Sequence, residues 1–156
     1  MLQRIFPERF DKHFRGHRFA LWLLYPITFM NLGISLVAIF RRDGGAQSAD
    51  GIPLDTFGSA GAEAVIHVVA LLGLANLLLY LFFVLALIRY RAMIPLLYVL
   101  IVADYIGHKA IGLMKPVAHA GAPPGNIVSL VLIGLSVMGL VLSLSGRGYA
   151  RNGSPA

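Results

Sequence analysis

Long apolar segments separated by short polar ones dominate this chain. The apolar segments cover residues 19–40, 62–88, 92–114 and 127–144, and each is bounded by charge, glycine or proline. An α-helix needs about 20 apolar residues to cross a hydrocarbon layer of roughly 30 Å. The pattern therefore predicts an all-α integral membrane protein, a four-helix antiparallel bundle with short connections apart from the loop 41–60.

The basic segment before the first span predicts a short interfacial helix. Phe6, Phe10 and Phe14 recur every four residues, while Lys12 and Arg15 point elsewhere, which is typical of a helix lying on anionic headgroups. A solvated, disordered tail is the alternative. We therefore divide the chain into a basic segment 1–18, a four-helix domain 19–145 and a tail 146–156.

The composition agrees with a membrane protein and excludes several kinds of site. Hydrophobic residues make up 58% of the chain and charged residues only 13%, against about 25% charged in soluble domains. A soluble domain of this length has too little interior for so much apolar surface. The absence of cysteine excludes disulfides, zinc–thiolate sites, iron–sulfur clusters and covalently attached c-type haem.

The basic residues flanking the spans predict the orientation. One side carries Arg4, Arg9, Lys12, Arg15, Arg18, Arg89, Arg91, Arg147 and Arg151, whereas the other carries Arg41, Arg42 and Lys115. Cytoplasmic loops are enriched in Lys and Arg, so both termini are expected in the cytoplasm. We expect a bacterial-type inner (plasma) membrane. Because the charge is divided between membrane sides, a nucleic-acid partner is not expected.

Each predicted span places a polar residue near the middle of the membrane. These residues are Asn31, Asn76, Asp104 and Ser136. Polar groups at such depth need a partner or a water-lined cavity. Because the cytoplasmic half of the spans is almost entirely apolar, the pattern predicts a polar pocket that opens to the outer side.

Asp104 and His108 form the densest polar cluster within a span. They are four residues apart and therefore share one helical face. This spacing favours a proton- or cation-binding site, with Asn31 or Asn76 as additional hydrogen-bond donors. The alternative is a polar clamp that only holds helices together.

Glu63 and His67 are expected at the outer mouth of the pocket, four residues apart on the second span. With His119 they are weak candidates for a divalent metal site. A haem b held by His67 and His108 is the other alternative, but depth counting offsets them by about 9 Å along the helix axis. We therefore predict no cofactor.

The sequence favours a small non-enzymatic transport or ligand-binding module embedded in the lipid bilayer. No nucleophile elbow, P-loop or zinc-protease helix is present. Four helices enclose little space, so a homodimer is expected. The alternative is an accessory or assembly subunit of a larger membrane complex with no ligand of its own. The sequence does not indicate the substrate or the direction of transport.

Overall fold

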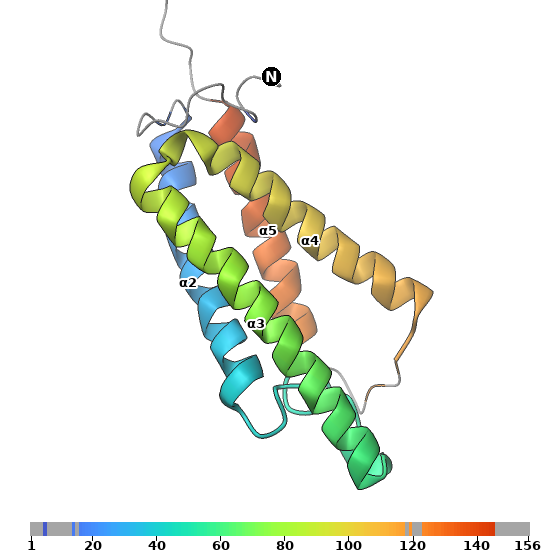
Figure 1. Ribbon diagram of the computed structural model, residues 1–156. Coiled ribbons are helices and arrows are strands. Elements are labelled where there is room, and N and C mark those ends of the chain that lie inside the picture. Colours follow the sequence, from blue (N-terminus) through green and yellow to red (C-terminus); the bar gives the residue numbers. More distant parts are fainter. Residues whose placement is uncertain (1–4, 6–13, 15, 118, 120–122, 146–156) are drawn as a thin grey trace, which may run out of the picture.

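The computed structural model describes residues 5, 14, 16–117, 119 and 123–145. In this part of the chain the structure is helical without strands, and its long helices are α2 (Arg18–Phe40), α3 (Ser59–Arg89), α4 (Ile94–Met114) and α5 (Pro124–Leu144) (Figure 1). Each is long and apolar enough to cross a membrane. The prediction of four long apolar helices is confirmed. Most of the predicted interfacial helix and the tail 146–156 lie outside the described residues.

Prolines mark the beginning of two helices. Pro95 lies in the first turn of α4, and Pro124 begins α5. Proline suits these positions because the first N–H groups of a helix have no partner within the helix. A short 3₁₀ turn, Arg91–Met93, joins α3 to α4.

The four helices have two distinct ends. The Arg89–Met93 turn lies at one end with the start of α2 and the end of α5, which we name the turn end (Figure 1). The loop between α2 and α3 lies at the other, which we name the loop end. α2 packs along α3 and α5, and α5 also packs along α4. Although α3 and α4 are consecutive, they diverge towards the loop end and contact each other far less.

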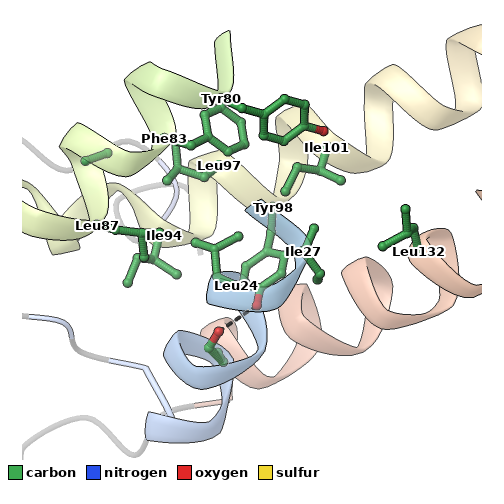
Figure 2. Packing of buried hydrophobic residues seen from close by; sticks show 12 residues of the cluster. Leu24, Ile27, Tyr80, Phe83, Leu87, Ile94, Leu97, Tyr98, Ile101 and Leu132 are labelled. Atoms are coloured by element: carbon green, nitrogen blue, oxygen red, sulfur yellow. Dashed lines mark hydrogen bonds between the residues drawn. The ribbon is translucent and has the colours of Figure 1, made fainter. Parts of the chain in front are cut away.

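The hydrophobic core is concentrated towards the turn end. Side chains from all four helices meet there (Figure 2), and the largest buried apolar ones are Leu24, Ile27, Phe83, Leu87, Ile94, Leu97, Tyr98 and Ile101, with Leu132 nearby. No residue of α4 after Ile101 is buried in the described chain. The loop-end half of α4 therefore depends on few apolar contacts with the other helices.

Two glycines allow close helix packing. A Cβ on Gly73 of α3 would lie 2.7 Å from the Cβ of Ala38 on α2. A Cβ on Gly139 of α5 would lie 2.3 Å from ring atoms of Tyr98 on α4. Small residues let transmembrane helices approach in this way.

The loop 41–58 folds back on the loop end of the helices. The Asp43 side chain accepts hydrogen bonds from the backbone N–H groups of Gly45 and Ser48, and the N–H of Gly125 at the start of α5 donates to the Ala49 carbonyl at 3.0 Å. Leu54 of this loop is buried, whereas Phe57 is 43% exposed.

Candidate functional site

Asp104 and His108 interact on the loop-end half of α4. The His108 Nδ1 atom lies 3.4 Å from the Asp104 Oδ1 atom and 2.9 Å from the Asp104 backbone oxygen. About one third of the Asp104 side chain (33%) and most of the His108 side chain (63%) are exposed. The spacing of four residues therefore does bring the two groups together, and no neighbouring helix covers them completely.

Asn31 is bound to a different partner from the one expected. It is buried on α2, where its side-chain NH₂ donates to the Ile27 carbonyl at 2.9 Å. Its side-chain oxygen accepts a 3.1 Å hydrogen bond from the Tyr105 hydroxyl of α4. No hydrogen bond joins it to Asp104 in the described chain. Because consecutive helical residues are about 100° apart, Tyr105 faces α2 while its neighbour Asp104 does not.

The residues predicted on the second span do not bind this pair in the described chain. Asn76 is half-buried on α3, and its side chain makes no hydrogen bond to a described residue. Glu63 and His67 are exposed, and neither forms an ion pair or hydrogen bond with Asp104 or His108. The reason is the divergence of α3 from α4 towards the loop end (Figure 1).

The metal site considered for Glu63, His67 and His119 is not formed. Among the described residues, no three His, Asp or Glu side chains are grouped as metal ligands. The ring of His119 instead makes a 2.8 Å hydrogen bond through Nδ1 to the backbone oxygen of Asp50. The loop between α2 and α3 thus engages His119 in place of the start of α3.

Asp50 is a polar neighbour of the site that the sequence analysis missed. A Cβ on Gly125 would lie 3.0 Å from the Asp50 Oδ1 atom, so this carboxylate lies against the first turn of α5. Burial raises the pKa of Asp50, and the nearby charges of His119 and His108 oppose that rise. Asp50 therefore lies close enough to both histidines to interact electrostatically with them.

Lys109 and Asn126 complete the polar contacts at the loop end. The Lys109 ammonium donates a 3.0 Å hydrogen bond to the Asn126 side-chain oxygen, which ties α4 to α5. The sequence analysis did not identify Asn126, because its position in the first turn of α5 resembles that of an ordinary solvated residue. Its contact with Lys109 depends on how the two helices cross.

The chemistry of this region is interpreted from its own residues. No known family model, curated protein or solved structure matches the chain. A carboxylate beside an imidazole provides a proton acceptor next to a group that can both accept and donate a proton. Ionisable groups within a membrane span also mark ion and proton pathways. The Asp104–His108 pair is therefore the candidate functional site.

Proposed function

We propose that the protein is a small transport or ligand-binding module of the plasma membrane, with four antiparallel spans. Its site is the Asp104–His108 pair, which binds a proton or a cation and is reached from the outer side. The observation that carries this proposal is a carboxylate–imidazole pair within a span that remains partly exposed. Charged groups at such depth are expensive unless they serve a ligand or a partner.

The Asn31–Tyr105 contact supports this assignment by contrast. A polar clamp is expected to join two helices, as the Tyr105 hydroxyl of α4 does with the buried Asn31 of α2. In the described chain the ion pair of Asp104 is with His108, one turn away on the same helix. The two polar groups thus differ in kind, and the Asp104–His108 pair is the one left available to a ligand.

The distribution of positive charge supports an outward opening. Arg18, Arg89 and Arg91 lie at the turn end. The start of α2, which follows the basic segment, and the end of α5, which precedes the tail, lie there as well. A cytoplasmic turn end follows from the positive-inside rule. The loop end, with Asp50 and His119, would then face outward.

The test compares Asp104→Asn with Tyr105→Phe in purified protein and in proteoliposomes. Asp104→Asn keeps the size of the side chain and removes its charge, so the fold should persist while proton flux and thermal stabilisation by Na⁺, K⁺ or Mg²⁺ are lost. Tyr105→Phe removes a helix-joining hydrogen bond, so it should lower stability slightly and retain both activities. An Asp104→Asn variant that matches the wild type in flux and ion response would overturn the proposal.

The second candidate function is an accessory subunit of a larger membrane complex. It is favoured by the exposed outer part of α4, where Ile106, Ile111 and Leu113 have no covering helix. In that case a partner helix would cover Asp104 and His108. The protein expressed alone would be unstable, whereas a self-sufficient module would purify as a defined monomer or homodimer. Gel filtration in detergent with light scattering separates the two.

A further inference from the structure

We propose that Asp50, together with His119, is the outer access point through which protons reach the Asp104–His108 pair. This inference rests on the proposed function and names its ligand as a proton. It assigns a role to two residues outside the membrane-spanning helices. Neither was part of the proton site predicted from the sequence.

The backbone fixes Asp50 at the junction of three segments. The N–H of Gly125 on α5 donates a 3.0 Å hydrogen bond to the carbonyl of Ala49, the residue before Asp50. His119, in the segment that follows α4, makes a 2.8 Å hydrogen bond through Nδ1 to the Asp50 carbonyl oxygen. A Cβ at Gly125 would lie within 3.0 Å of the Asp50 carboxylate. The backbone of Asp50 is thus held at the loop end, and its exposed carboxylate lies against the first turn of α5.

From this place Asp50 faces titratable groups of both neighbouring segments. His119 makes a hydrogen bond to the Asp50 backbone carbonyl, and the Lys109–Asn126 hydrogen bond brings the part of α4 that carries His108 to the first turn of α5, against which the Asp50 carboxylate lies. The charges of both histidines lower the pKa of this carboxylate. α5 contains no charged residue and offers Asn126, which already binds Lys109 of α4. His108 in turn contacts Asp104 one turn deeper in the span. These ionisable side chains form a series that runs from the loop to the middle of α4.

The chemical nature of this series favours a proton over a metal ion. Carboxyl and imidazole groups alternate along it, and chains of Asp, Glu and His are the usual material of membrane proton relays. In the described chain no three such groups are placed to share a metal. An imidazole accepts a proton on Nε2 and releases one from Nδ1, so His108 can pass a proton from Asp50 to the Asp104 carboxylate without a net change in its own charge.

Proton flux into proteoliposomes tests the role of Asp50. The vesicles contain a pH-sensitive dye, and a K⁺ gradient with valinomycin drives protons inward. Asp50→Asn should slow the flux by about tenfold or more, because a positioned proton-transfer group contributes about 100-fold or more to such a step. Asp55→Asn is the matched control, since Asp55 is an exposed acid of the same loop that binds only Gln47 in the described chain. Its flux should equal that of the wild type.

The outcomes separate this inference from the proposed function. If Asp50→Asn behaves like Asp55→Asn while Asp104→Asn abolishes flux, the access role of Asp50 is wrong and the inner site stands. If Asp104→Asn also leaves flux unchanged, the proposed function fails. A wild-type protein that carries no protons but binds Na⁺ or K⁺ through Asp104 would overturn the proton assignment alone.

A spectroscopic measurement tests the geometry independently of transport. The pKa of Asp50 is followed by carboxyl ¹³C NMR in the wild type, His119→Gln and His108→Gln. Each histidine lowers the pKa of Asp50, so each substitution should raise it. An Asp50 pKa that does not change in His108→Gln would show that the loop and the inner pair are not coupled, and would overturn the inference even if Asp50→Asn proved poorly folded.

Discussion

The hydroxyl of Tyr98 on α4 donates a 2.6 Å hydrogen bond to the backbone carbonyl of Ala20 on α2 (Figure 2). The Tyr98 ring also packs directly against Gly139 of α5. One fully buried side chain therefore joins three helices near the turn end. In the described chain the loop-end half of α4 has no buried aromatic side chain of this kind, and the Tyr105–Asn31 and Lys109–Asn126 hydrogen bonds link it to α2 and α5 instead.

Gly139→Ala should destabilise the protein by about 1–3 kcal/mol, the usual cost of overpacking. The added Cβ would lie 2.3 Å from two atoms of the buried Tyr98 ring, which has no free space to move into. Gly134→Ala on the same helix is the control, because a Cβ there meets nothing within 4 Å. Thermal unfolding in detergent measures both variants. Equal losses of stability would contradict the packing of Tyr98 over Gly139.

A double-mutant cycle on Asn31→Ala and Tyr105→Phe should give a coupling energy of about 0.6 kcal/mol, typical of a hydrogen bond between membrane helices. The reason is the 3.1 Å bond between these side chains. The corresponding cycle with Asn31→Ala and Asp104→Asn should give none. Unfolding in mixed micelles measures both cycles. Coupling of Asn31 to Asp104 and not to Tyr105 would show that α4 is rotated.

Asp43 should contribute stability that is lost in acid. Burial alone would raise its pKa, but hydrogen bonds from Ser48 and Gly45 and the charge of Arg41 lower the pKa from 3.8 to about 2. A lowered pKa stabilises the folded state above the unfolded value, and this contribution disappears as the pH falls from about 4 to 2. Allowing for solvent screening, we expect a loss of about 1 kcal/mol.

Asp43→Asn is the variant that tests this prediction. It should remove this part of the pH dependence, because the amide does not titrate in that range. Thermal unfolding of both proteins is compared between pH 2 and about 5. Parallel curves for the two proteins would show that the carboxylate of Asp43 does not stabilise the loop.

Reporter fusions should place residue 50 outside the membrane and residues 90 and 150 in the cytoplasm. The prediction follows from the excess of Lys and Arg in the N-terminal segment, in the Arg89–Arg91 turn and in the C-terminal tail, compared with the loop that contains residue 50. Alkaline phosphatase and green fluorescent protein fusions report the two sides. An external signal at residue 90 would invert the topology and place Asp50 in the cytoplasm.

Purified protein should contain no haem. His67 and His108 are the pair considered as axial ligands, and their expected axial offset of about 9 Å is too large for two ligands on one iron. The divergence of α3 from α4 at this end also separates the two helices (Figure 1). An absorbance spectrum measures this directly. A stoichiometric Soret band that disappears on replacing either histidine would contradict the prediction.

The features predicted from the sequence are local ones. The length and apolarity of each span are properties of one continuous segment, so the four long helices followed from the chain alone. The Asp104–His108 contact is likewise set within α4, because residues four apart always share a helical face. Neither depends on how the helices are arranged around each other.

The contacts that define the site depend on the tertiary structure. Tyr98 and Ala20 are 78 residues apart, Tyr105 and Asn31 are 74 apart, and His119 and Asp50 are 69 apart. In a membrane protein apolar side chains face both lipid and core, so the hydrophobic pattern does not indicate which face of a helix turns inward. The crossing of α4 over α5 and the path of the loop 41–58 decided which polar residues meet, and these are properties of packing that no single segment contains.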